Sequence, residues 1–206
     1  MMAVKYKEFE QFVQKVSKAD VDAFITACVK ELAARLLAKV VKRTPVGRPP
    51  NLGDRTEKVT GASGKTRVML TKDGEIYQKY WSGYRGGTLR RGWISQSESE
   101  AESSKGGVSA ADIQNYLAGA TVIRMGDVYR IEIINPVSYA EYVEYGHRQK
   151  PGKYVPALGK KLKKAWVPGR FMMTISVAEV EAIKPKLLQK LSLIHISEPT
   201  RHSLIS

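Results

Sequence analysis

Two short stretches of this sequence carry residue types that could do chemistry. The first, Gly61-Ala62-Ser63-Gly64-Lys65-Thr66, resembles the end of a loop that holds nucleotide phosphates. Such a loop also needs a glycine five residues before the last one, where this chain has Val59. It needs a helix directly afterwards, so that backbone amides face the phosphates, whereas residues 67–70 have the pattern of a strand. The sequence therefore does not predict a nucleotide site here.

The second stretch contains Glu141, Glu144 and His147, which could serve as acids and bases. The two glutamates lie about one helical turn apart, and such a pair is more often a solvated face or a salt-bridge partner than a catalytic couple. His147 stands beside Arg148, where a surface or interface role is the simpler interpretation. No serine has the strand–turn–helix context of a hydrolase nucleophile. We therefore predict that the protein is not an enzyme.

Metal and redox chemistry have little support in the composition. The chain has one cysteine, Cys28, and three histidines, of which only His147 lies outside residues 191–206. A single cysteine excludes an intramolecular disulfide and suits a reducing compartment. Cys28 lies in an apolar helical stripe, so we predict a core residue rather than a reactive thiol. We expect no metal site and no cofactor.

The segment after Gly146 is the strongest candidate for function. From Gly146 to Arg170 the chain has eight lysines or arginines and no acid, within a protein of net charge +14. These residues are Arg148, Lys150, Lys153, Lys160, Lys161, Lys163, Lys164 and Arg170. Three interpretations remain open: a solvated loop, a surface that faces DNA phosphates without reading sequence, or a surface that docks on an acidic protein face.

A short helix is expected directly before this basic loop. Asn135 can cap the helix, Pro136 suits its first position, and Gly146 can end it. Three tyrosines at a spacing of three residues would form a stripe on one side of it: Tyr139, Tyr142 and Tyr145. We predict that the helix and the loop together present a surface.

Two amphipathic helices are expected at the N-terminus, over residues 5–16 and 20–43, with Pro45 ending the second. The predicted inward stripe of the second helix is Val21, Phe24, Ile25, Cys28, Val29, Leu32, Leu36 and Val40. A C-terminal helix is expected over residues 168–183, and Pro185 should bend or end it. Its predicted inward residues are Phe171, Met172, Ile175, Ala178 and Ile183.

Strands are expected near residues 89–95, 121–125 and 128–134, together with a hairpin in 66–81 that turns at Asp73-Gly74. A short helix is expected over residues 110–117, and an irregular segment rich in serine and glutamate over 96–107. The sequence thus predicts an α+β fold, in which a mostly antiparallel sheet packs against a long N-terminal helix and a C-terminal helix.

We expect a single domain over residues 1–190, with an inserted arm at about 47–86. A lone hairpin is marginal in water, so this arm should pack on something, such as a neighbouring subunit. Residues 191–206 resemble the translation of a transposon end and adapter used for sequencing libraries, and we expect them not to be biological. Resequencing the locus tests this. No stretch has the ~20 apolar residues of a membrane span, and the start lacks the apolar run of a signal peptide.

Four segments of the chain form a recognisable series: Arg43-Thr44-Pro45-Val46, Gly87-Thr88-Leu89-Arg90-Arg91-Gly92-Trp93, residues 134–148 and Trp166-Val167-Pro168-Gly169-Arg170-Phe171-Met172. Taken in this order, they resemble the Hong Kong phage gene-product-ten family of tailed bacteriophages. The resemblance covers residues 20–46, 87–96 and 119–183. Its last segment is most similar to members from contractile-tailed phages and prophages. Residues 47–86 and 97–118 are longer than the family's connections, and surface loops accept such insertions at small entropic cost.

The resemblance implies a structural virion protein, made in the bacterial host cytoplasm, that acts in the neck or in tail completion. It implies a ring of identical subunits, sixfold, between the head connector and tail proteins, with non-specific contact to genomic DNA and no membrane. The implied contact residues are Tyr139, Tyr142, Glu144, His147, Arg148, Trp166 and Arg170. The candidate DNA-facing residues are Lys150, Lys153, Lys160, Lys161, Lys163 and Lys164.

Two alternatives from other classes remain open. A free basic nucleic-acid-binding protein would explain the charge, although the chain has no recognised binding motif, and tight DNA binding by the monomer would favour it. A small enzyme with an unrecognised site has less support, because histidine and cysteine are scarce.

Overall fold

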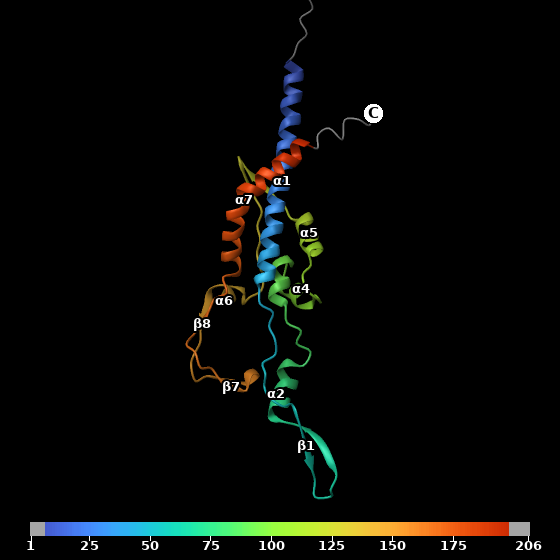
Figure 1. Ribbon diagram of the computed structural model, residues 1–206, viewed down its shortest axis with the longest axis vertical. Coiled ribbons are helices and arrows are strands. Elements are labelled where there is room, and N and C mark those ends of the chain that lie inside the picture. The colour runs from blue at the N-terminus through green and yellow to red at the C-terminus, as the bar shows by residue number, and fades with distance from the viewer. Residues whose placement is uncertain (1–6, 198–206) are drawn as a thin grey trace, which may run out of the picture. The chain divides into compact units, whose positions relative to one another are not determined.

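The computed structural model describes the backbone of residues 7–197 and the side chains of residues 21–190. Figure 1 shows the ribbon and labels several of its elements. Contacts divide the chain into two compact units, each built from separate stretches of sequence. Unit 1 contains the chain up to Arg43, Val108–Ile134 and the chain from Met173 onward. Unit 2 contains Thr44–Gly107 and Asn135–Met172.

One long helix, α1 (Lys7–Arg43), organises unit 1. The prediction of two helices with a break near Ser17 was wrong. No glycine or proline lies within α1, so nothing interrupts the backbone hydrogen bonds at that point. The helix ends at Arg43, as predicted from Pro45, because the residue before a proline is pushed out of the helical conformation.

The buried face of α1 differs in part from the predicted stripe. Cys28 and Val40 are buried as predicted, and burial raises the pKa of the Cys28 thiol above its ordinary value. Val21 is instead 52% exposed. Four residues outside the predicted stripe are also buried: Ala33, Ala34, Leu37 and Val41. The alanines allow close approach, and helix α5 (Ala110–Gly119), which was predicted at 110–117, packs against α1.

A small hairpin also packs on α1. Its strands are β3 (Ile123–Met125) and β4 (Val128–Arg130), which pair antiparallel, as predicted for this region. Asp22 on α1 accepts a hydrogen bond from the Tyr129 hydroxyl and one of 2.6 Å from Arg124 Nη1. The hairpin is therefore tied to α1 by polar contacts.

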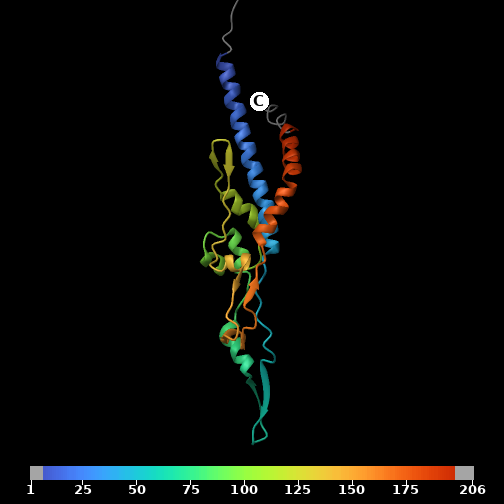
Figure 2. The same cartoon turned by 90° about the vertical axis from the view of Figure 1, so that its left-hand side faces the viewer.

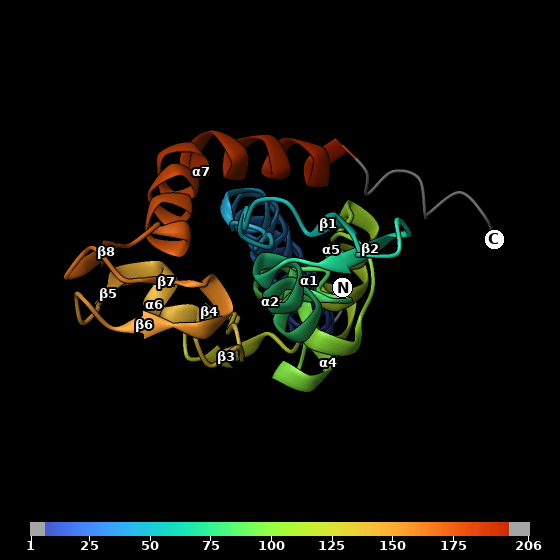
Figure 3. The same ribbon diagram turned by 90° about the horizontal axis from the view of Figure 1, so that it is seen from below.

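The C-terminal helix, α7 (Met172–Ser197), starts later than predicted; it buries Met172 as predicted, but its other buried residues differ from the predicted ones. Ile175 and Ile183, which were expected to face inward, are 42% and 37% exposed. The buried positions recur mostly at spacing four: Met172, Ser176, Val180 and Leu187. Pro185 lies inside α7, and Figure 3 shows this helix bent. Most of the segment 191–206 lies outside the described residues, so its predicted origin stays a prediction.

Unit 2 begins with an exposed hairpin of β1 (Thr56–Thr60) and β2 (Thr66–Leu70). All ten strand residues are exposed, and Figure 1 shows the hairpin extending beyond helix α2 (Lys72–Trp81). The predicted turn at Asp73-Gly74 was wrong, because Thr71 caps a helix there and accepts a hydrogen bond of 3.0 Å from the Gly74 amide. Residues 67–70 are a strand, as predicted, so no helix follows the Gly-Lys-Thr sequence.

The expected strand at 89–95 was also wrong. These residues form α3 (Thr88–Arg91) and the single turn η1 (Gly92–Ile94), since a short apolar run does not distinguish strand from helix. Gly87 precedes α3 with a φ of 81°, a conformation that suits glycine. The next segment, expected to be irregular, contains α4 (Glu98–Ser103), capped by the Ser97 hydroxyl.

The basic segment forms a long hairpin rather than a loop. Helix α6 (Ala140–Tyr145) leads into β5 (Gly146–Arg148), which pairs antiparallel with β8 (Trp166–Pro168). Farther out, β6 (Tyr154–Val155) pairs with β7 (Lys160–Lys161) around the turn η2 (Pro156–Leu158). Figure 2 shows the two sides of this hairpin running alongside each other. We call residues 146–168 the basic hairpin.

The α+β class is confirmed, with a long N-terminal helix, a C-terminal helix and antiparallel strand pairs. Within residues 7–197, the strands form four separate two-stranded sheets. The division into two units describes contacts, whereas the single-domain prediction concerns which part of the chain folds independently. The single domain therefore stays a prediction.

Candidate protein interaction surface

The start of α6 is held by the motif around α3. The helix begins at Ala140, so the prediction that Asn135 caps it was wrong. The Asn135 side chain instead accepts a hydrogen bond of 3.2 Å from the Val137 amide and donates one of 2.9 Å to the Leu89 carbonyl. Asn135 thus fixes the approach to α6 against α3.

A second tie reaches the same turn from α4. The Ser138 amide and hydroxyl donate to the two carboxylate oxygens of Glu98 at 3.2 and 3.0 Å. The serine- and glutamate-rich segment therefore has a structural role at the start of α6.

The end of α6 fits closely against the chain that follows the basic hairpin. Gly146, predicted to end this helix, does so with a φ of 87°. A Cβ atom on Gly146 would lie 2.4 Å from the Val167 carbonyl oxygen, and one on Gly169 would lie 2.2 Å from the Glu144 carbonyl oxygen. Only glycine fits at these two positions without a backbone shift. The amides of Arg170 and Phe171 complete the junction, donating to carbonyls of α6 at 2.8 and 3.0 Å.

The basic hairpin is braced along its length and at its tip. The Gln149 amide donates to the Ala165 carbonyl at 2.8 Å, and the Leu162 amide donates to the Lys153 carbonyl at 2.8 Å. At the tip, Trp81 Nε1 of α2 donates to the Ala157 carbonyl at 2.6 Å. The hairpin carries six lysines that are all exposed and form no salt bridge with a described residue: Lys150, Lys153, Lys160, Lys161, Lys163 and Lys164.

Exposed aromatic residues lie at the start of α6, along α6 and on β8. Tyr142 and Tyr145 are 59% and 61% exposed, Trp166 is 49% exposed, and Tyr139 is 41% exposed. Partial burial raises the pKa of the Tyr139 hydroxyl above its ordinary value. Arg148 and Arg170 are exposed beside them in sequence. We call these six residues the aromatic surface; tyrosine, tryptophan and arginine are the residues that dominate protein interfaces.

Two predicted contact residues are less accessible. Glu144 is 7% exposed, so its side chain lies inside unit 2 rather than on the aromatic surface. His147 is half-buried, with its ring edge-on to Tyr142 at a centroid distance of 5.8 Å. Its Nδ1 atom is buried and has no hydrogen-bond partner among the described residues. The sequence did not predict these orientations, because helical spacing alone does not say which side faces a neighbour.

The segments that carried the family resemblance meet in unit 2. The Thr44 hydroxyl accepts a hydrogen bond of 2.7 Å from Trp93 Nε1, and the Thr44 carbonyl accepts bonds of 3.2 and 2.6 Å from Arg90 Nε and Nη2. A Cβ atom on Gly92 would lie 2.3 Å from Asn135 Oδ1. The threonine–proline, glycine–x–leucine–arginine and asparagine–proline motifs therefore form one structural cluster that supports α6.

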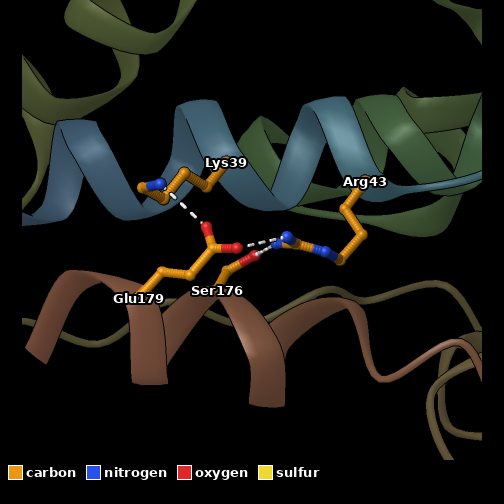
Figure 4. A network of polar contacts seen from close by, with 4 residues as sticks. All are labelled: Lys39, Arg43, Ser176 and Glu179. Atoms are coloured by element: carbon orange, nitrogen blue, oxygen red, sulfur yellow. Dashed lines mark hydrogen bonds and ion pairs between the residues drawn. The ribbon is translucent and has the colours of Figure 1, made fainter. Parts of the chain in front are cut away.

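Unit 1 has its own polar network between α1 and α7 (Figure 4). The Glu179 carboxylate accepts bonds from Lys39 Nζ at 2.8 Å and Arg43 Nη2 at 2.7 Å. Arg43 Nη1 also donates to the Ser176 hydroxyl at 2.6 Å. The Lys39 bond, followed by the bond from Arg43, holds the pKa of Glu179 below its ordinary value, although partial desolvation opposes this. The pairing explains why this face of α7 turns toward α1.

Two of the hollows within the described residues bear on binding, and neither was predicted. An apolar groove of about 600 Å³ lies in unit 1 between α1, the chain around β4, and α7. Its lining includes Val29, Leu32, Leu36, Ile131, Ile133 and Val177. The first three belonged to the predicted stripe of α1, which is thus only partly covered. A second hollow, lined by basic residues, lies between two loops of unit 2. The signal for it in the sequence was a pair of glycines next to a basic residue in each loop, Gly86-Gly87 and Gly106-Gly107.

Within the described part of the chain, no group of three or more histidine, cysteine, aspartate or glutamate side chains could hold a metal ion. Among these residues, no helix is both long enough and apolar enough to cross a membrane.

The exposed tyrosines and tryptophan of unit 2 have the composition that is typical of protein interfaces. The bacteriophage HK97-gp10-like tail-component family matches residues 7–146, and the chain belongs to this family. It is therefore a structural component of a bacteriophage tail and a virion protein. No curated protein and no solved structure matches the chain. The last resembling segment, Trp166 to Met172, lies beyond the matched residues, so the contractile-tail refinement stays a prediction.

Proposed function

We propose that this protein completes the tail at the head–tail junction, as a ring of identical subunits between the head connector and the tail. The observation that carries the proposal is the aromatic surface. Its tyrosines and its tryptophan are 41–61% exposed, although α6 and β8 are fixed by close backbone contacts. A rigid surface of this composition loses little conformational entropy on binding, which favours a permanent interface.

Membership in a phage tail-component family is compatible with a ring and supports it as part of the proposal. Each subunit would use the aromatic surface against a different surface of its neighbour, and heterologous contacts of this kind close into rings when the rotation allows. A sixfold ring is our expectation for this junction. The apolar groove of unit 1 supplies a second uncovered surface for neighbouring subunits or for head and tail proteins.

The basic hairpin suits the channel of such a ring. Its six lysines are exposed and unpaired among the described residues, so they can offset phosphate charge as the genome passes. Contacts to phosphate alone carry no sequence information and allow DNA to slide. The same lysines favour the alternative of a free nucleic-acid-binding protein, which would bind DNA tightly as an isolated monomer.

The test is particle assembly in a producing strain. Deletion of the gene should leave separate heads and tails, or tails of abnormal length, under the electron microscope. The double variant Tyr142→Ala, Trp166→Ala should fold but fail to restore joined particles, because both side chains are about half exposed and contribute little to the fold.

The matched control is Tyr80→Ala, Tyr154→Ala, which removes two aromatic side chains of similar exposure, 42% and 46%, outside the aromatic surface. This control should restore joined particles. Normal particles from the deletion strain would remove the proposed function. Equal rescue by both double variants would exclude the aromatic surface from the junction.

A further inference from the structure

A cavity of about 290 Å³ in unit 2 has an unusual lining. It lies between two loops that include residues 85–87 and 104–107, and four of its lining residues are glycines. Its basic side chains are Arg85, Arg90, Arg91 and Lys105, and no acidic residue lines it. None of the four forms a salt bridge with a described residue. Four like charges around one small cavity create a positive electrostatic potential, which favours the binding of an anion.

Arg91 shows that the cavity is built rather than accidental. Its side chain is buried, and it bridges the two loops. Nη1 donates to the Gly86 carbonyl at 3.1 Å and to the Gly106 carbonyl at 3.4 Å, while Nε donates to Ala101 at 2.8 Å. These carbonyls satisfy donors but carry no net charge. A buried cation without a counterion is costly, so a bound anion would stabilise the site.

The other basic residues divide into a fixed one and two free ones. Arg90 is held by two hydrogen bonds to the Thr44 carbonyl, so its position is set before any ligand arrives. Arg85 and Lys105 are exposed and have no hydrogen bond or ion pair with a described residue. The site thus combines fixed positive charge with two side chains that can close over a ligand. Pre-set charge of this kind lowers the cost of binding.

We propose that this cavity binds a carboxylate presented by an acidic segment of a neighbouring virion protein. A guanidinium group matches a carboxylate through two parallel hydrogen bonds. A cavity of about 290 Å³ accepts one acidic side chain, whereas duplex DNA presents its phosphates along a convex rod and is better served by the exposed basic hairpin. Glu102 lines an adjoining cavity of about 440 Å³ together with Arg85, Arg91 and Lys105, but it forms no salt bridge with them. The choice of partner rests on the proposed function.

The test measures binding of a fluorescein-labelled oligoglutamate peptide and a labelled DNA duplex to the isolated full-length protein. The variant is Arg85→Ala, Lys105→Ala, which removes the two free cations. The control is Lys65→Ala, Arg67→Ala on the β1–β2 hairpin, which removes the same charges from exposed positions. Both variants should melt close to the parent, because none of these side chains has a charged partner among the described residues.

We expect the cavity variant to weaken peptide binding about tenfold, which corresponds to the loss of one charge-assisted interaction, and the control to change it less than about twofold. Equal weakening by both variants would reduce the effect to net charge and overturn the proposal. Loss of DNA binding without loss of peptide binding would assign the cavity to phosphate and also overturn it. The binding assay needs no particles, so its outcome is independent of the deletion experiment. Normal particles from the deletion strain would exclude the proposed function, whereas the peptide-binding result would still decide whether the cavity binds a carboxylate.

Discussion

Thr44 has a buried polar environment in unit 2 that joins three hydrogen bonds. It is fully buried, and its hydroxyl accepts the bond from Trp93 Nε1 while its carbonyl accepts two bonds from Arg90. Because Thr44 follows directly after α1 and precedes Pro45, its backbone cannot continue the helix. Thr44 therefore follows the end of α1 and also holds Arg90 of α3 and Trp93 of η1 by hydrogen bonds.

Replacing Thr44 with valine should test this anchor. The substitution keeps the shape but leaves the buried Trp93 N–H without an acceptor, so we expect the free energy of unfolding to fall by about 1 to 3 kcal/mol. Urea unfolding followed by tryptophan fluorescence measures it. The control Thr56→Val, on an exposed strand position, should stay within about 0.5 kcal/mol. An unchanged Thr44→Val midpoint would mean that Trp93 finds another acceptor.

Glu179 links stability to pH in unit 1. Its pKa is lowered in the folded state, mainly by the hydrogen bond from Lys39, so its contribution is present above the unfolded pKa of ~4.3 and is lost as pH falls through the folded value. Glu179→Gln should therefore lower the melting temperature at neutral pH by a small amount, because the pair is partly exposed.

The difference between parent and Glu179→Gln should shrink as the pH falls through the acid range and should narrow in high salt. Melting curves from acid to neutral pH measure both trends. A difference that stays constant across this range would show that the packing of the side chain, rather than its charge, is what the variant removes.

At the scale of elements, the junction of α6 with β8 carries the aromatic surface. Gly169 allows the chain after β8 to reach the α6 carbonyls, since a Cβ atom there would lie 2.2 Å from the Glu144 oxygen. We expect Gly169→Ala to destabilise unit 2 by about 1 to 3 kcal/mol, as overpacking does. Hydrogen exchange should increase at the Arg170 and Phe171 amides, which donate to α6.

A matched alanine substitution is available at Gly119, where a Cβ atom would meet nothing within 4 Å and the backbone has no positive φ. Gly119→Ala should leave stability unchanged or slightly raised, because alanine is the better helix former. If both variants melted together, the close approach at Gly169 would not be what holds the junction.

For the whole molecule, the net charge of +14 predicts salt-dependent binding of polyanions. Affinity for duplex DNA should fall as salt rises, with a log–log slope of about −0.9 for each phosphate contact. We expect the replacement of four lysines with glutamine to reduce the magnitude of this slope by the equivalent of up to about four phosphate contacts. These residues are Lys160, Lys161, Lys163 and Lys164. Fluorescence anisotropy at several salt concentrations measures the slope. An unchanged slope would exclude the basic hairpin from DNA contact.

Much of the local structure could be predicted from the sequence by itself. Pro45 ends α1, Gly146 ends α6, and residues 110–117 and 121–134 contain the expected helix and hairpin. These outcomes depend on backbone chemistry within a few residues, which acts before any tertiary contact forms. The order of the motifs also predicted the family, which the match over residues 7–146 confirmed.

Only the tertiary structure decided which faces are buried and which loops meet. Residues 89–94 became helical rather than extended, and α7 buried Ser176 instead of Ile175 because Arg43 and Lys39 pair with that face. Glu144 lies inside unit 2, and residues 85–87 and 104–107 join to form the basic cavity. The physical reason is that periodicity specifies an apolar or polar face only relative to its own element. The partner for each face comes from segments far away in the sequence.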